Sequence, residues 1–309
     1  MLYSSQKKPP AQETPRRERG FPMSMKFEQK PYFMPVFFHR EDENGITDMR
    51  YHEPAKINVI SLTYETDREV LEKCIPDCYT LLEPYVNIKF CEFFNLSWMA
   101  GKSYTLININ CPVHFKGEQD DMDGDLVLTM FENHCDPIIG GRESMGYSKY
   151  FAEIPLISAF DGKYSCQASC WGTPFLKLTV DTNVAASEAD IAEVKRVEGR
   201  TQGKMHYKYI PAVKEKDEPA SMNYVRPDCS YPTVLPNFVK PADYPYELGA
   251  SESEWGMGSI EWIAPKWEQW PHGFRIGQGL ASLKVKRILA ARHFTYMDPG
   301  VYSTCYRLR

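Results

Sequence analysis

Thr105-Leu106-Ile107-Asn108-Ile109-Asn110 is the most regular stretch of this 309-residue chain. Ile107 and Ile109 alternate with Asn108 and Asn110, and this period of two predicts a β-strand with one apolar face. It lies within a longer predicted strand at residues 103–115, and comparable runs of β-branched and aromatic residues occur at 57–64, 87–98, 125–131, 165–180 and 280–289. The sequence therefore predicts a chain dominated by β-strands.

Helix signals are few and short. Asp67 is a predicted N-cap for a helix that runs to about Cys74 and stops before Pro76. Ser187 opens a second helix that runs to about Val197, with acidic residues in its first turn. Together with the strands, these short helices predict a mainly β (α+β) fold.

The domain organisation follows from composition. Residues 1–20 are rich in Lys, Arg, Pro, Gln and Glu and cannot bury enough apolar surface to order themselves, so we expect a disordered tail. Residues 21–309 are long enough for a single large domain. Within it, residues 211–270 interleave Pro, Tyr and Trp like a long irregular insertion, which we expect either to cover the site or to pack on a neighbouring surface.

Charge and hydropathy exclude several classes of partner. The net charge is -5 and 25% of the residues are charged, which gives no basic surface for nucleic acid. No run of about 18 consecutive apolar residues is present, and the first residues lack the apolar core of a secretory signal. We therefore expect a cytoplasmic protein with no membrane and no nucleic-acid partner.

The nine cysteines are an odd number and are spread through the chain. Cys74/Cys78 and Cys166/Cys170 each have three intervening residues, but neither pair has the spacing or the histidine partners of a zinc site. Reduced, mostly buried thiols are expected instead. Because no glycine-rich phosphate loop, Ser-His-Asp order or pair of carboxylates stands out either, neither a metal nor a cofactor is predicted.

A second informative stretch ends in a lysine: Gly141-Arg142-Glu143-Ser144-Met145-Gly146-Tyr147-Ser148-Lys149. Lys149 stands among Tyr147, Tyr150 and Phe151 and precedes the apolar run 154–157, so we expect it to be buried. Burial lowers the pKa of an amine, and a neutral amine can attack a carbonyl carbon whereas an ammonium cannot. Lys149 is therefore the candidate nucleophile, and a lysine that extends its ammonium into water is the alternative.

This stretch resembles the signature of the acetoacetate decarboxylase family. The family signature is Gly-Arg-Glu, four residues and then Pro-Lys-Lys, and Lys149 takes the place of its first, imine-forming lysine. The similarity runs in order from about Tyr51 to Arg309, and it is carried by the stretches 60–67, 90–93, 104–105, 111–115, 124–126 and 287–294. The resemblance implies a large curved antiparallel sheet that closes into a cone-like β-barrel with few peripheral helices. It also implies a homo-oligomer and a small-molecule carbonyl substrate.

The resemblance assigns candidate roles around Lys149. Glu92 resembles the acidic residue that the family carries in or beside its pocket, where burial would make it a proton shuttle. Arg142 and Glu143 match the signature, and they are expected either to form a buried ion pair or to orient the substrate. Further candidates for proton transfer are Tyr104, His114 and His134.

Three departures from the family pattern bear on the reaction. Tyr150 stands where the decarboxylases have a second lysine, and Leu106 stands where an acidic residue follows the Tyr-Thr pair. The arginine that helps to bind the substrate carboxylate has no clear counterpart, since Lys56 is only loosely aligned with it. These losses weaken the case for decarboxylation of acetoacetate but leave imine formation intact.

The sequence therefore favours a cofactor-independent Schiff-base lyase that acts on a keto acid or related carbonyl compound. Decarboxylation and aldol/dehydration chemistry both remain open, because acid and base placement around the imine decides between them. The long insertion favours a specialised, secondary-metabolic substrate over acetoacetate. The alternative is a protein of the same fold that binds or cyclises a hydrophobic small molecule without an imine.

Overall fold

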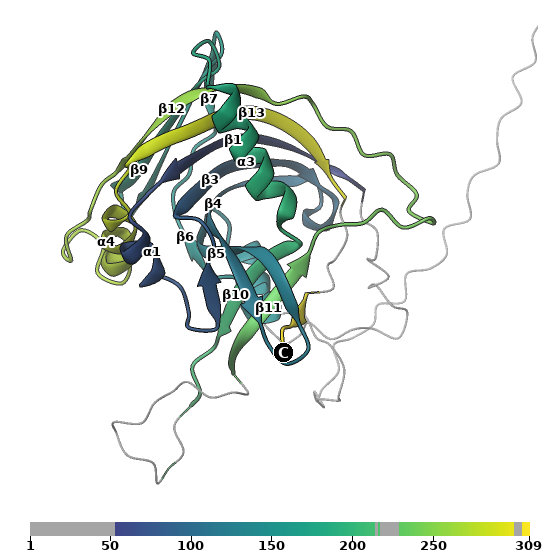
Figure 1. The fold of residues 1–309 in the computed structure, drawn as a ribbon, viewed down its shortest axis with the longest axis vertical. Coiled ribbons are helices and arrows are strands. Elements are labelled where there is room, and N and C mark those ends of the chain that lie inside the picture. The colour runs from purple at the N-terminus through teal and green to yellow at the C-terminus, as the bar shows by residue number, and fades with distance from the viewer. Residues whose placement is uncertain (1–52, 214–215, 217–228, 300–304) are drawn as a thin grey trace, which may run out of the picture. The chain divides into compact units, whose positions relative to one another are not determined.

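The structure is a computed structural model that describes residues 53–213, 216, 229–299 and 305–309. The tail expected at residues 1–20 lies outside the described residues, as does part of the segment 211–270. The strands that are described belong to one sheet (Figure 1). No helix in this part of the chain is long and apolar enough to cross a membrane.

The sheet has fourteen strands in the order β14-β11-β10-β5-β4-β3-β1-β13-β12-β9-β8-β7, with β2 paired to β4 and β6 paired to β5 beside this path. The strands are β1 (Ala55–Glu65), β2 (Tyr79–Leu81), β3 (Tyr85–Leu96), β4 (Lys102–Lys116), β5 (Asp121–Glu132), β6 (Lys149–Phe151), β7 (Ser158–Phe160), β8 (Lys163–Cys170), β9 (Thr173–Asp181), β10 (Gly203–Tyr209), β11 (Ser230–Pro236), β12 (Glu254–Trp262), β13 (Arg287–Asp298) and β14 (Tyr306–Arg307). Neighbours are antiparallel except that β6 and β10 run parallel to β5. The sheet is thus mixed, which corrects the expected antiparallel arrangement.

The two ends of this path, β14 and β7, are edge strands. No hydrogen bonds join them within the described ranges, so the sheet is not closed there by strand pairing. Figure 1 shows strong curvature between the two ends, with β1, β3 and β13 forming an arch. The expected curvature is therefore present, whereas the expected closure into a barrel is not seen in the described residues.

Alternation along the central strands gives the sheet two faces, which we call face A and face B. Face A carries the larger core cluster, which includes Ile60, Phe90 and Ile107. Face B carries a second cluster, which includes Val59, Cys91 and Leu106. Residues of β8 and β9 pack against face A, where the rings of Phe131 and Phe175 lie 4.7 Å apart. Both faces are covered, and Asn108 and Asn110 of β4 are buried on face B, so the alternation of Ile with Asn does not mark a solvent-exposed face as it predicted.

The helices are α1 (Arg68–Glu72), α2 (Cys135–Gly140), α3 (Glu188–Arg200) and α4 (Phe274–Ser282), with a 3₁₀ turn η1 (Ser97–Met99) and a π turn η2 (Gly141–Met145). Asp67 and Ser187 cap α1 and α3 with side-chain oxygens that accept backbone N–H groups, as predicted. On α3, Val194 clusters with Ala290 of β13 on face B. This helix therefore covers part of the face that carries Cys91.

Two predicted strands differ from the structure. Residues 165–180 form the separate strands β8 and β9, joined by a tight turn in which Trp171 (φ 55°) and Gly172 (φ 69°) both lie in the left-handed region. A bulky residue is rarely found there, so the turn has little signal in the sequence. Residues 280–289 contain the end of α4 and the start of β13, because the apolar spacing from Phe274 fits a helix.

The segment 211–270 is less irregular than expected. It contains β11 and β12, and both strands pair within the sheet. Pro232 and Pro236 interrupt the pattern of β11, and Gly256 and Gly258 interrupt that of β12. These residues weaken the strand signal in sequence without preventing the strands from pairing.

Candidate active site

Lys149 is positioned by a compact connection that follows β5. The chain passes from β5 through α2 into the π turn η2, a form of helix that is often found at functional sites. Gly146 ends this turn in the left-handed region (φ 93°), and its N–H donates to the carbonyl of Gly141. β6 then begins at Lys149, directly opposite Met130 of β5, and both side chains lie on face B.

The side chain of Lys149 is buried and makes three contacts. Its Nζ lies 2.8 Å from Oε1 of Glu132 and also donates a hydrogen bond of 2.8 Å to the carbonyl of Pro137. The same nitrogen is 4.9 Å from the centre of the Tyr147 ring. The expected burial of Lys149 is therefore confirmed, and the alternative of an ammonium extended into water does not apply.

Glu132, the partner of this lysine, is fully buried. Apart from the ion pair, neither of its carboxylate oxygens accepts a hydrogen bond from the described residues. Burial raises the pKa of Glu132, and the nearby Lys149 ammonium acts against that rise. The carboxyl group of Glu132 is therefore better able to hold a proton than an exposed glutamate would be.

Gly141 explains why the signature begins with glycine. A Cβ at this position would lie 2.6 Å from both Cε and Nζ of Lys149, whereas a Cβ on the preceding Gly140 would meet nothing within 4 Å. Both residues have ordinary right-handed helical φ angles, so the constraint at Gly141 is the space that the lysine needs.

The substitution Gly141→Ala is therefore expected to displace the lysine amine while leaving the fold intact. We expect trapping of a carbonyl compound on Lys149 to fall at least about tenfold, since small misplacements of a reacting group are costly. Gly140→Ala is the matched control and should leave trapping unchanged. Equal trapping in the two variants, with both folded by circular dichroism, would contradict this role for Gly141.

Arg142 and Glu143 do not form the buried ion pair that was one of the two expectations. Arg142 is exposed, and its guanidinium donates a hydrogen bond of 2.8 Å to the carbonyl of Lys149. Glu143 is half-buried, and no ion pair joins it to Arg142. Arg142 thus holds the backbone of the candidate nucleophile in place.

Tyr104 lies on face B with Lys149. Its ring is buried and stacks on Phe93, with 4.8 Å between ring centroids. Burial raises the pKa of the Tyr104 hydroxyl well above its ordinary value, and the charge of Glu132 adds to the effect. Tyr104 is therefore a neutral phenol in this site and can serve as a proton donor.

Glu92 is buried as expected, but it lies on face A, on the opposite side of the sheet from Lys149. Its carboxylate accepts hydrogen bonds of 2.6 Å from the amide of Asn58 and from the N–H of Ile157. The neighbouring Cys91 is the residue of this strand that faces the lysine side. A shift of one residue along a strand exchanges the two faces, which explains the difference from the expected position beside the imine.

His206 of β10 is a further buried group near Lys149, and the sequence patterns did not indicate it. Its ring is fully buried, and its centroid lies 3.7 Å from that of the Tyr147 ring. Neither ring nitrogen has a hydrogen-bond partner among the residues that the structure describes. Burial lowers the pKa of His206 to about 3, and the positive charges of Lys204 and Lys149 add to the shift. The imidazole is therefore neutral at physiological pH.

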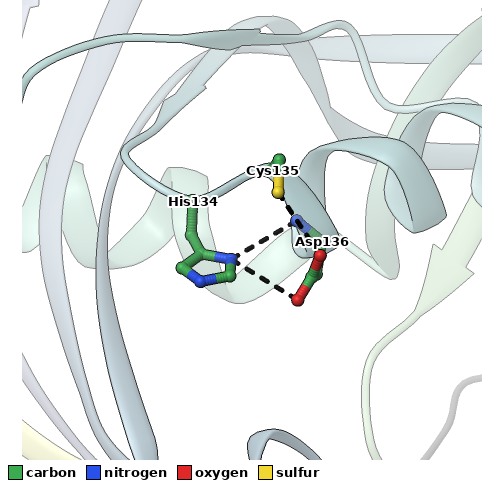
Figure 2. Close-up of side chains that lie close together, drawn as sticks. All are labelled: His134, Cys135 and Asp136. Carbon is green, nitrogen blue, oxygen red and sulfur yellow. Dashed lines mark hydrogen bonds and ion pairs between the residues drawn. The ribbon is translucent and has the colours of Figure 1, made fainter.

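The two histidines that the sequence offered as candidates, His114 and His134, form their contacts away from the Lys149 amine. His114 contacts Asp121 and Asp123 at the β4–β5 hairpin, with Nδ1 2.8 Å from the carboxylate of Asp123. His134 caps α2, and Figure 2 shows it beside Cys135 and Asp136. Neither histidine contacts Lys149.

His134, Cys135 and Asp136 are a group of potential metal ligands, with their donor atoms within 4.8 Å of one another. Their polar atoms are engaged locally, because His134 Nδ1 accepts the N–H of Asp136 and Cys135 Sγ donates to the Asp136 carboxylate (Figure 2). Cys135 and Asp136 are exposed. These contacts account for the cluster as the cap of α2, and we assign no ion to it.

Comparison with known proteins shows which family this chain belongs to. The family model described as acetoacetate decarboxylase matches residues 33–298. The chain belongs to the acetoacetate decarboxylase family. The resemblance noted in the sequence is thereby confirmed, and Lys149 lies within the matched region together with Glu132 and Tyr104.

Relatives in the acetoacetate decarboxylase family match only part of the chain. The acetoacetate decarboxylase of Acidiphilium cryptum (strain JF-5) is 35% identical over 91 residues, which are 29% of this chain and 35% of that protein. Acetoacetate decarboxylase 1 of Bradyrhizobium diazoefficiens is 29% identical over 129 residues, 39% of this chain and 49% of that protein. The matches thus span less than half the length of these relatives.

Solved structures share the fold over most of the chain. Acetoacetate decarboxylase from Legionella pneumophila aligns with a TM-score of 0.55 and 18% identity, over 83% of this chain and 86% of that one. The enduracididine biosynthesis enzyme MppR aligns with a TM-score of 0.58 and 13% identity, over 90% and 94%. MppR has also been solved in complex with pyruvate and with the condensation product of pyruvate and imidazole 4-carboxaldehyde.

Proposed function

We propose that this protein is a cofactor-independent Schiff-base lyase that acts on a keto acid or related carbonyl compound, with Lys149 as the nucleophile. The observation that best supports the proposal is the burial of the Lys149 amine against the buried Glu132 carboxylate, 2.8 Å away, in a family of decarboxylases. A carboxylate in this position can take a proton from the ammonium without exposing either group to water.

In the proposed reaction, Nζ of Lys149 attacks the carbonyl carbon, and loss of water gives a protonated imine. For a β-keto acid, the bond to the carboxyl carbon breaks, its electron pair moves towards the imine nitrogen, and carbon dioxide leaves an enamine. Protonation of the enamine carbon and hydrolysis of the new imine release the ketone and restore the amine. Alternatively, the enamine carbon attacks an aldehyde, and loss of water completes a condensation.

Different residues around Lys149 carry out the individual proton transfers. Glu132 accepts the proton that leaves the ammonium, and Tyr104 donates a proton to the departing oxygen or to the enamine carbon. Arg142 is a positioning residue that acts through the backbone carbonyl of Lys149. Glu92 takes no part in these steps, because it lies across the sheet and is bonded to Asn58.

Aldol and dehydration chemistry stands beside decarboxylation in this proposal for two reasons. Leu106 lies on face B where decarboxylases of this family carry an acidic residue, and Tyr150 replaces their second lysine. Among structures of the same fold, MppR is complexed with a pyruvate condensation product. By family resemblance we also propose a homo-oligomer and closure of the curved sheet around the pocket. The long segment 211–270 is the basis for proposing a substrate of specialised metabolism.

A second candidate function is non-covalent binding or cyclisation of a hydrophobic carbonyl compound. It is favoured by the contacts that engage Lys149 Nζ, which has both Glu132 and the Pro137 carbonyl as partners. In that case the lysine would serve as the fixed partner of a buried carboxylate. The two functions differ in whether a covalent bond to Nζ ever forms.

The test is intact-protein mass spectrometry after incubation with β-keto acids, pyruvate and simple ketones in the presence of cyanoborohydride. We expect a mass increase equal to one reduced imine, and peptide mapping should place it on Lys149. Omission of cyanoborohydride is the control for non-specific modification. A folded protein that gives no adduct with any of these compounds, or an adduct only on other lysines, would favour the non-covalent function.

A further inference from the structure

Lys204 of β10 is a half-buried lysine that has no partner for its ammonium in the described part of the chain. Its side chain lies on face B, and its Nζ forms no hydrogen bond to the described residues and has no carboxylate oxygen among them within 4.0 Å. Burial lowers the pKa of Lys204, and the positive charge of Lys89 is the next cause. Its Nζ is not among the buried polar atoms that lack a partner, so the ammonium remains accessible from solvent and can meet an incoming anion.

The neighbouring charged groups are already engaged with one another. Glu198 of α3 accepts two hydrogen bonds of 2.7 Å from Arg292 and lies 3.4 Å from the ammonium of Lys89. Burial raises the pKa of Asp125, which lies opposite Lys204 on β5, and the positive charge of Lys89 acts against that rise. Asp125 and Asp298 attract Lys204 electrostatically, but neither is close enough to form an ion pair. The ammonium of Lys204 is therefore left for another anion.

Lys204 and Lys149 lie on the same face and beside the same strand. Both β10 and β6 run parallel to β5, with Lys204 opposite Asp125 and Lys149 opposite Met130. Asp125 and Met130 are five positions apart along β5, which corresponds to about 16 Å between the backbones. His206 lies between the two lysines and feels the charge of both. A substrate that reaches both amines must hold its anionic group well apart from its reacting carbonyl.

We propose that Lys204 binds a carboxylate of the substrate whose carbonyl group reacts at Lys149; this inference rests on the proposed function. The substrate is accordingly a keto acid in which several bonds separate the carbonyl carbon from the carboxylate. A carboxylate bound there would form a charge-assisted hydrogen bond with the ammonium and favour the charged form of the lysine. Acetoacetate does not fit this spacing, because a single methylene group joins its carbonyl carbon to its carboxylate.

The experiment uses a series of methyl ketone acids of increasing length, namely acetoacetate, 4-oxopentanoate, 5-oxohexanoate and 6-oxoheptanoate, each compared with its methyl ester. Cyanoborohydride trapping on Lys149 is measured against concentration in the full-length protein. We expect the acid to be trapped at concentrations at least about tenfold lower than the ester for one of the longer members. Lys204→Met should remove that preference and Lys204→Arg should retain it. Lys177→Met, at an exposed ion pair with Glu261, is the control.

Three results would overturn the role of Lys204. They are an unchanged ratio of acid to ester in Lys204→Met, the absence of any preference for the acid in the wild-type protein, and an adduct on Lys204 itself. If no compound is trapped on Lys149, the proposed function fails separately. The role of Lys204 is then decided by calorimetric binding of 5-oxohexanoate, which Lys204→Met should weaken at least about tenfold; equal binding, or no binding to the wild-type protein, would overturn it.

Discussion

Replacement of Lys149 by methionine is expected to abolish cyanoborohydride trapping at this position and to lower turnover of a carbonyl substrate by about 10⁴-fold or more, as is usual when a covalent nucleophile is removed. Methionine has a similar length, so the loss would come from the amine and not from the space it fills. The change also leaves the buried Glu132 without its partner. Breaking a buried pair from one side typically costs about 3–5 kcal/mol in the free energy of unfolding.

The stability loss and the activity loss can be separated with a second substitution. In the double variant Lys149→Met/Glu132→Leu the whole pair is replaced by apolar side chains, an exchange that is often neutral for stability or favourable. We expect this protein to recover most of the free energy of unfolding, measured by urea denaturation, and still to show no trapping. Wild-type turnover in the folded Lys149→Met protein would exclude the imine mechanism.

Patterns in the sequence were sufficient to predict the elements of the central sheet. β1, β3, β4 and β5 contain long runs of β-branched and aromatic residues, and Asp67 and Ser187 mark helix starts with oxygens that accept backbone N–H groups. The turn at Trp171 could not be predicted, because its left-handed backbone carries a residue type that rarely adopts it. The parallel pairing of β6 and β10 with β5 depends on contacts between distant segments, which local patterns do not contain.

The candidate site also contains residues that local sequence patterns predict and residues that only the contacts between distant segments bring together. Lys149 could be predicted from its signature and its apolar surroundings, and Gly141 now has a physical reason in the space that the lysine occupies. Glu132 had one local signal, since it continues the alternation of Met130 along β5, but only the parallel pairing with β6 brings it to the amine. Glu92 was placed beside the imine on sequence similarity, and its strand position puts it on the other face.

His206 is expected to make the protein less stable as the pH falls. The pKa of His206 is lowered to about 3 in the folded protein from an ordinary value of 6.5. Between these two values the unfolded chain binds a proton that the native state does not bind, so each step towards acid favours unfolding. The contribution is absent above about pH 6.5 and grows by about 1.4 kcal/mol per pH unit below it, which amounts to about 2 kcal/mol between pH 6.5 and pH 5.

This effect must be measured as a difference between proteins, because Glu132 acts in the opposite direction. The pKa of Glu132 is raised, so over its own range the native state binds a proton more readily than the unfolded chain, and acid favours the native state. His206→Gln removes the histidine contribution and leaves Glu132 in place. Urea denaturation at pH 7, 6 and 5 should show a smaller loss for His206→Gln than for the wild-type protein, by about 2 kcal/mol at pH 5. His272→Gln, at an exposed histidine, should follow the wild-type profile; parallel profiles for all three proteins would mean that His206 is not the group responsible.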